Sequence, residues 1–195
     1  MGWLRQLYDW VMRLAAHKRA GWALFGVSFM ESSFFPIPPH VMLIPMVLAD
    51  RSKALVYWLQ ATIGSVLGGL FGYAIGYFLF AQIGEPILEL YGAAEKFAAF
   101  KDSYNENGAW IVFTFGVTPF PYKVITIASG TTQLDLMVFT VTSIIARGLI
   151  FGVIVGLLYA FGPPIRDFIE RRLGILTILF VALLIGGFVA IKFLL

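Results

Sequence analysis

The sequence predicts an all-α integral membrane protein, organised as an inverted repeat of a re-entrant helical hairpin followed by a transmembrane helix. Hydrophobic residues make up 59% of the 195 residues and charged residues only 13%, whereas about a quarter of the residues in soluble domains are charged. Prolines interrupt two long apolar segments near their centres, and a helix-length segment with regularly spaced glycines follows each of them. These observations favour one compact membrane domain.

Residues 1–19 are predicted to form an amphipathic helix that lies in the membrane interface, and not a cleaved targeting sequence. Apolar residues recur with helical spacing on one face, and charged residues fall on the other. The apolar face carries Trp3, Leu7, Trp10 and Leu14, and the polar face carries Arg5, Asp9 and Arg13. A soluble cap packed on the membrane domain is the alternative interpretation.

Three segments are long and apolar enough to cross the membrane without a break. A spanning helix needs about 20 apolar residues, and residues 54–80, 136–161 and 173–195 provide them without an internal proline. Residues 85–106, between the two halves of the chain, are predicted to form an amphipathic connector helix on the surface. Residues 162–195 are predicted to form a cytoplasmic turn and a C-terminal transmembrane helix.

Residues 20–49 and 108–134 are predicted to be broken in the middle. Proline removes a backbone donor and drives the residue before it out of helical geometry, so each segment becomes two half-helices. Non-helical backbone at membrane depth is tolerated only when it is buried in protein or faces a wet cavity. We therefore expect re-entrant hairpins, or broken helices that line a cavity. The residues that shape this cavity are Pro36, Pro38, Pro39, Pro119 and Pro121.

The two halves of the chain resemble each other. FFPIPPHV (34–41) aligns with VTPFPYKV (117–124), so that two prolines match and His40 matches Lys123. Because small residues let helix backbones approach closely, we expect tight packing by the ladder that follows each break, within one chain or in a homodimer. The ladders are Gly64, Gly68, Gly72 and Gly76, and then Gly148, Gly152, Gly156 and Ala160. Two copies inserted from opposite sides form an inverted repeat with a substrate site at the midplane.

The basic residues predict the orientation in the membrane. If each broken segment returns to the side from which it started, one side of the membrane holds nine basic residues and the other holds two. The larger set is Arg5, Arg13, Lys18, Arg19, Arg51, Lys53, Arg166, Arg171 and Arg172, and the smaller set is Lys96 and Lys101. The side with more basic residues is cytoplasmic, and the N-terminus lies there. Full crossings would give the same counts, so charge leaves both topologies open.

Two charged residues lie deep in apolar segments. A charge at the centre of a membrane helix costs about 2.5 to 3.5 kcal/mol on insertion scales, so each must have a compensating role. Glu31 is predicted to carry a proton or to be the structural partner of a buried cation. Arg147, which is always charged, is predicted either to pair with Glu31 or to bind an anion.

His40 and Lys123 follow the two breaks, where half-helix N-termini present free amides and a positive dipole end. A cation at this position suits a lipid phosphate, so both residues are predicted to bind the headgroup, together with Arg147 and Thr118. His40 titrates near neutral pH when unperturbed, which makes it a second candidate for a proton relay. The alternative for His40 is an interfacial side chain near Asp50.

A combination of motifs identifies a family. Glu31 precedes a proline-rich break, the second break TPFPYK (118–123) leads to Ser129 and Gly130, and the next helix contains Arg147 followed by Gly148. Over about residues 20–161 this pattern resembles the DedA family, also called the VTT-domain or SNARE-associated Golgi protein family, and especially its YqaA-like branch.

The resemblance implies two opposed re-entrant loops, a multi-pass protein of the bacterial inner membrane, and movement of lipids between leaflets. Bacterial members recycle undecaprenyl phosphate or support phospholipid handling, and eukaryotic relatives scramble phospholipids. Glu31 matches the family's first acidic position in the first loop. The second acidic position falls in VMLIPM here, and Thr118 and Lys123 stand where arginines commonly frame the proline of the second loop.

The sequence therefore predicts a flippase or scramblase for a phosphate-bearing lipid, such as undecaprenyl phosphate or a phospholipid, with proton coupling left open. A small-ion or proton-coupled solute transporter is the alternative. An intramembrane enzyme is disfavoured, because the chain has no HExxH motif, no cysteine, two histidines, and no pair of aspartates in the apolar centres. We expect no catalytic residues, cofactor, metal site or nucleic-acid partner.

Overall fold

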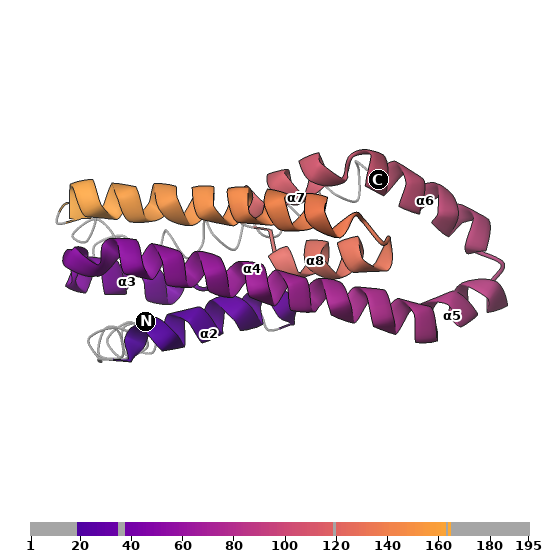
Figure 1. Cartoon of the computed structure of the whole chain (residues 1–195), viewed down its shortest axis with the longest axis horizontal. Helices are drawn as coiled ribbons and strands as arrows, with labels where there is room; N and C mark the ends of the chain where they lie inside the picture. Colours follow the sequence, from indigo (N-terminus) through magenta and orange to yellow (C-terminus); the bar gives the residue numbers. More distant parts are fainter. Residues whose placement is uncertain (1–18, 35–37, 119, 163, 165–195) are drawn as a thin grey trace, which may run out of the picture.

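The computed structural model describes residues 19–34, 38–118, 120–162 and 164. Every regular element in these residues is helical. The elements are α2 (Ala20–Ser33), α3 (His40–Ala49), a 3-10 turn (Arg51–Lys53), α4 (Ala54–Leu79), a π-helical segment (Phe80–Gly84), α5 (Glu85–Leu90), α6 (Ala94–Glu106), α7 (Gly108–Val117) and α8 (Tyr122–Thr131). A last helix, Leu136–Gly162, is drawn in orange in Figure 1 without a label. The predicted interfacial helix (1–19) and the C-terminal segment (162–195) lie almost wholly outside the described residues, as do Pro36 and Pro119.

Helix α4 is the central element, and its neighbours run along it in defined directions. A side chain at Gly64 would meet the backbone of Phe25, and one at Gly68 would meet that of Phe29, so α2 is parallel to α4. Gly72 faces Thr126, and Gly76 faces the backbone of Ile127, so α8 is also parallel to α4.

The last helix runs antiparallel to α4. Trp58 donates its indole N–H to the carbonyl of Gly148 at 2.8 Å, and the Tyr73 hydroxyl donates to the carbonyl of Leu134 at 2.6 Å. Helix α7 runs beside this last helix in the same direction, because Gly108 lies against Leu134 and Gly116 against Ala146.

Two helix pairs therefore start from opposite ends of the molecule and reverse direction near its middle. The pair α2 and α3 opens toward the start of α4, and the pair α7 and α8 opens toward its far end (Figure 1). Helix α2 ends at Ser33 and α3 begins at His40, and α7 ends at Val117 and α8 begins at Tyr122, so the helices end on either side of the predicted breaks. The inner ends of the two pairs touch, because the Thr126 hydroxyl of α8 donates to the carbonyl of Ser32 in α2 at 2.9 Å.

Two apolar cores flank this meeting point. The first joins α2, α3, the start of α4 and the end of the last helix, and it includes Leu24, Leu43, Met46, Ala61 and Phe151. The second joins α6, α7, α8 and the start of the last helix, and it includes Tyr104, Val112, Tyr122, Leu134 and Phe139. Polar side chains lie buried between the two cores.

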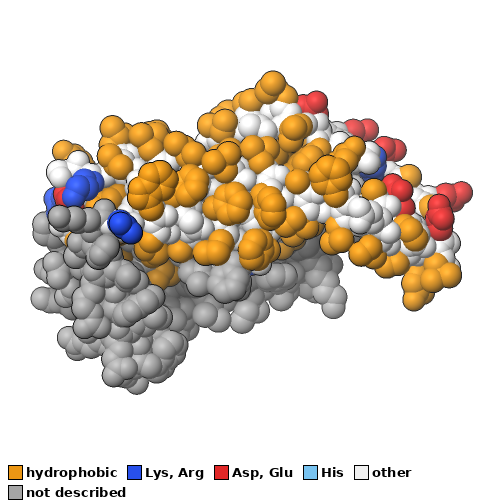
Figure 2. Space-filling view, turned by 60° about the horizontal axis from the view of Figure 1, so that its bottom comes forward, with side chains coloured by type: hydrophobic (Ala, Val, Ile, Leu, Met, Phe, Trp, Pro, Cys, Tyr) orange, Lys and Arg blue, Asp and Glu red, His pale blue; other side chains and the backbone are white. Residues whose placement is uncertain are grey.

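The outside of the molecule fits a membrane. Arg51–Leu90 and Leu136–Gly162 are each long and apolar enough to cross a bilayer. Figure 2 shows an apolar face along the molecule, with most of the basic side chains in view at one end and most of the acidic side chains at the other. Among the described residues, the exposed acidic ones are Glu85, Glu89, Glu95, Asp102, Glu106 and Asp135.

The prediction of one continuous connector helix over residues 85–106 is wrong, because two helices occupy this stretch. Gly92 has a φ of 61°, the left-handed conformation that ends many helices. Around it, the N–H of Ala93 donates to the carbonyl of Leu88 at 2.8 Å, and that of Gly92 donates to Glu89 at 3.1 Å. These bonds form a Schellman motif that ends α5.

Gly92→Ala is expected to lower the free energy of unfolding by about 1–2 kcal/mol, because a residue with a Cβ is strained in this conformation. Unfolding in detergent micelles, followed by circular dichroism, measures the loss. The matched control is Gly26→Ala in α2, where an added Cβ meets no described atom within 4 Å. An equal effect of the two substitutions would contradict this account of the α5 cap.

Candidate functional site

A buried ion pair links the two halves of the chain. Arg147 Nη2 lies 3.1 Å from Glu31 Oε2, and the two side chains are 4% and 11% exposed. Glu31 comes from the last turn of α2 and Arg147 from the middle of the last helix. Of the two roles predicted for Arg147, this structure has the ion pair with Glu31.

Two serines close a ring of hydrogen bonds around this pair. Arg147 Nε donates to Ser65 Oγ at 2.6 Å, and Ser32 Oγ donates to Glu31 Oε2 at 3.2 Å. The two serine hydroxyls lie 2.7 Å apart. Since Ser32 uses its proton on Glu31, Ser65 is the donor between them. The ring therefore joins α2, α4 and the last helix in one polar unit.

Sequence reasoning missed both serines. Ser32 directly follows Glu31, and Ser65 lies beside Gly64 in the glycine ladder. Both side chains are fully buried. The sequence signal that could have found them is a serine next to a residue already predicted to be buried. A buried hydroxyl needs a hydrogen-bond partner, so each serine could have been predicted to contact a polar group.

Aromatic rings cover the Arg147 guanidinium. Its central carbon lies 4.9 Å from the ring centre of Tyr122 and 4.6 Å from that of Phe151, which gives cation–π contacts in a desolvated site. The Tyr122 hydroxyl is itself held 2.6 Å from Ser143 Oγ. Arg147 Nη1 makes no hydrogen bond to any other described residue, so part of its donor capacity is unused.

His40 and Lys123 lie at the starts of α3 and α8, as predicted. The His40 ring is 5.4 Å from the ring of Phe151, which places it one aromatic side chain away from Arg147. Lys123 is half-buried, and within the described part of the chain its ammonium group has no ion pair or hydrogen bond. Thr118 is exposed, and its hydroxyl donates to the Phe115 carbonyl at 3.2 Å, so it supports the broken backbone.

The two glycine ladders are not equivalent. The first ladder brings α4 into backbone contact with α2 and α8. Among the described residues of one chain, the second ladder packs closely only at Gly152, where a Cβ would lie 3.3 Å from the Trp58 indole nitrogen. The nearest atom to a Cβ at Gly148 would be 3.8 Å away, and Gly156 faces no described atom within 4 Å. The reason is that Trp58, and not a backbone segment, faces this part of the last helix.

The remaining cavity-shaping residues are placed near the breaks. Pro39 is buried, and Pro38 and Pro121 are half-buried. Pro121 directly precedes α8, with a φ of −60° and an extended ψ of 104°. Among the described residues, no group of three or more histidine, cysteine, aspartate or glutamate side chains could hold a metal ion.

The fold and the site define a class of protein: a helical membrane protein in which two opposed hairpins meet at a buried ion pair. The model of the VTT-domain family matches residues 35–160. The chain belongs to this family, which is also the DedA family of the sequence resemblance.

Curated relatives agree with this assignment. An uncharacterized protein of Haemophilus influenzae is 38% identical over 141 residues, which cover 72% of this chain and 73% of that protein. An uncharacterized protein of Histophilus somni matches with the same identity and coverage. The Golgi apparatus membrane protein TVP38 of Eremothecium gossypii is 22% identical over 154 residues, or 75% of this chain and 48% of that protein. No solved structure matches the chain significantly.

Proposed function

We propose that this protein moves a phosphate-bearing lipid between the two leaflets of the inner membrane, as a flippase or scramblase. The observation that carries this proposal is the Glu31–Arg147 ion pair, buried where two opposed hairpins meet. A guanidinium held at this depth costs free energy, and it suits a phosphate, which it binds through paired N–H donors.

In this proposal the hairpins are re-entrant. The α2–α3 pair inserts from the cytoplasmic side and the α7–α8 pair from the opposite side, with the N-terminus in the cytoplasm. The basic end of the molecule and its acidic end (Figure 2) support this orientation. A headgroup that passes between the hairpin tips then meets Arg147 halfway across.

The substrate phosphate and Glu31 compete for the same guanidinium. In the absence of lipid, Glu31 neutralises Arg147, and the ring through Ser32 and Ser65 holds both side chains. When a phosphate takes the place of the carboxylate, Glu31 loses its cation and becomes a site for a proton. This exchange would couple lipid movement to a proton, with His40 as the second proton carrier.

Lys123 is proposed to receive the phosphate before Arg147 does. It lies in the first turn of α8, where backbone N–H groups add to its positive charge. Because its ammonium has no partner among the described residues, it can bind an anion without giving up an existing contact. Thr118 is exposed in the same break, and it would bind the phosphate by turning toward it the hydroxyl proton that it now donates to the Phe115 carbonyl.

Lys123→Gln is expected to slow lipid flipping about tenfold, because one charge-assisted hydrogen bond contributes about 1.5–3 kcal/mol. The measurement is translocation of undecaprenyl phosphate and of a phospholipid in liposomes that contain the purified protein, with and without a pH gradient. Lys96→Gln, an exposed lysine on α6, is the matched control and is expected to keep the full rate.

Two results would contradict the proposal. Flipping no faster than in empty liposomes, for either lipid, would rule out the transporter and direct attention to ion current across the same liposomes. Equal rates for Lys123→Gln and Lys96→Gln would leave lipid transport standing but would remove Lys123 from the headgroup site.

A further inference from the structure

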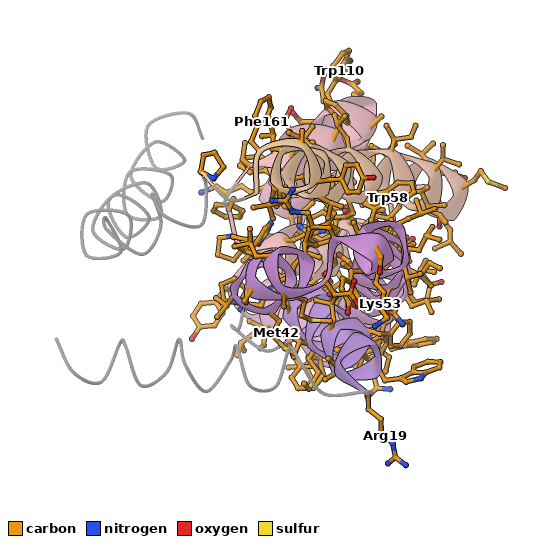
Figure 3. All side chains as sticks on the ribbon, turned by 90° about the vertical axis from the view of Figure 1, so that its left-hand side faces the viewer. Arg19, Met42, Lys53, Trp58, Trp110 and Phe161 are labelled. Atoms are coloured by element: carbon orange, nitrogen blue, oxygen red, sulfur yellow. The ribbon has the colours of Figure 1, made fainter. Side chains whose placement is uncertain are left out.

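A groove lies on the flank of the molecule, away from the hairpin tips. It has a volume of about 540 Å³ and runs between the start of α4 and the end of the last helix, with walls that include Arg51, Leu55, Trp58, Val155 and Gly156. Figure 3, which views the molecule from the end where α4 starts, shows Trp58 and Lys53 together on one side.

The second glycine ladder explains why this groove exists. Gly152 and Gly156 have no side chains to fill the space between the helices, and Trp58 leans across it. The Trp58 indole is fixed by its hydrogen bond to the Gly148 carbonyl, and a Cβ at Gly152 would lie 3.3 Å from its nitrogen. Because no described backbone segment packs against Gly152 and Gly156, an apolar channel stays open on the surface of the molecule.

No carboxylate of the described residues neutralises the charge at the mouth of the groove. Arg51 Nη1 donates to the main-chain carbonyl of Tyr159 at 3.3 Å, and no carboxylate pairs with this guanidinium in the described part of the chain. Asp50 is already engaged, because Lys53 Nζ lies 2.7 Å from its carboxylate. Hydrogen bonds from Lys53 and then Ser52 lower the pKa of Asp50. The carboxylate therefore stays ionised and remains paired with Lys53.

We propose that this groove is a selective binding site for an anionic phospholipid that exchanges with the bilayer, separate from the lipid that is transported. The phosphate contacts the Arg51 guanidinium and the Ser52 region, and one acyl chain lies along Leu55, Trp58 and Gly156. From Arg51 to Trp58 the helical rise gives a channel about 10 Å long, which suits the first half of an acyl chain. The apolar walls match the acyl chain of such a lipid, and the cationic end at Arg51 matches its phosphate.

A second copy of this chain fits the groove less well. Two-fold packing on this face would bring the two Arg51 side chains toward each other. Their like charges would repel, since each Asp50 is already paired with Lys53 and is not available to Arg51. An anionic lipid instead supplies the missing negative charge, at a site near the membrane surface where each basic residue attracts anionic lipid.

The test uses the fluorescence of Trp58 as the only tryptophan, after replacement of Trp3, Trp10, Trp22 and Trp110 by phenylalanine. The protein is placed in vesicles that contain increasing fractions of brominated phosphatidylglycerol or brominated phosphatidylcholine. We expect half-maximal quenching at a fraction of the anionic lipid about fivefold lower, which is the preference that one basic residue at the surface provides.

Arg51→Gln is expected to remove this preference, and Gly156→Leu to remove it by filling the channel. Arg19→Gln, at the same end of the molecule (Figure 3), is the control and is expected to keep it. As a second measurement, the thermal midpoint of the full chain with all its tryptophans should rise with phosphatidylglycerol and not with phosphatidylcholine, and Arg51→Gln should abolish the difference.

Three results would overturn the proposal: equal quenching by the two lipids, a preference that survives Arg51→Gln, or a dimer that Gly156→Leu dissociates. The last would assign the groove to contact between copies of the chain. None of these readouts depends on flipping, so this proposal and the transport proposal can fail independently.

Discussion

Glu31→Gln is expected to destabilise the protein by about 3–5 kcal/mol, the usual effect of removing one partner of a buried ion pair. The substitution leaves Arg147 charged, since a guanidinium does not lose its proton in a protein. Its side chain is only 4% exposed, so water cannot replace the carboxylate. The contacts with Tyr122 and Phe151 remain, but they do not neutralise the charge.

Arg147→Gln is expected to cost less than Glu31→Gln. The group left behind is then a carboxyl, which can take up a proton and become neutral, whereas an arginine cannot. Ser32 and Ser65 can still hydrogen-bond to a protonated Glu31 and to each other. A larger destabilisation by Glu31→Gln than by Arg147→Gln therefore indicates an ion pair. Two side chains that only fill space would not give this order.

Unfolding in mixed detergent micelles measures both single variants and the double variant Glu31→Gln/Arg147→Gln. The double variant is expected to recover a large part of the stability that Glu31→Gln loses, because no charge remains buried. If the loss of unfolding free energy in the double variant equalled the sum of the losses in the two single variants, the ion pair would be contradicted. Effects of substitutions at independent sites are additive, whereas those at coupled sites are not.

The positions of the breaks and of the buried charges could be predicted from the sequence, because both depend on local features of the chain. Proline acts on its own turn of helix, and the closely spaced prolines around Pro38 and Pro121 mark the breaks without any knowledge of the fold. A single proline is a weaker signal, since Pro45, which also predicted an interruption, lies inside α3. A charge inside an apolar segment is also visible locally, which is why the pattern of residues alone singles out Glu31 and Arg147.

The partners of these charges could not be predicted in the same way. Whether Arg147 reaches Glu31 depends on the rotation and depth of two helices that are far apart in the sequence, and periodicity fixes neither. The contribution of Ser65 depends on the same geometry. Similarly, the repeat predicted two equivalent glycine ladders, but only contacts decide that Gly68 faces a backbone and that Gly156 faces an open groove.

The polar ring is sensitive to the distance between α2 and α4, and Gly68 sets this distance. A Cβ at Gly68 would overlap the carbonyl of Phe29, so even one methyl group forces the two helices apart. The contact of the Ser33 hydroxyl with the Gly68 carbonyl at 3.0 Å would be lost, and only its bond to the Phe29 carbonyl in its own helix, at 2.7 Å, would remain. The same shift moves Ser65 away from Ser32 and Glu31 away from Arg147.

Gly68→Ala is therefore expected to lower the free energy of unfolding by about 3 kcal/mol, the upper range for overpacking a well-packed core. The matched control is Gly156→Ala in the second ladder, where the Cβ meets no described atom within 4 Å. Alanine is a better helix former than glycine by about 1 kcal/mol, so the control is expected to be neutral or slightly stabilising. Thermal unfolding in detergent compares the two variants. If both substitutions were neutral, α2 and α4 would not be in backbone contact, and the ring that joins Glu31 to Arg147 through Ser32 and Ser65 could not be held as the structure has it.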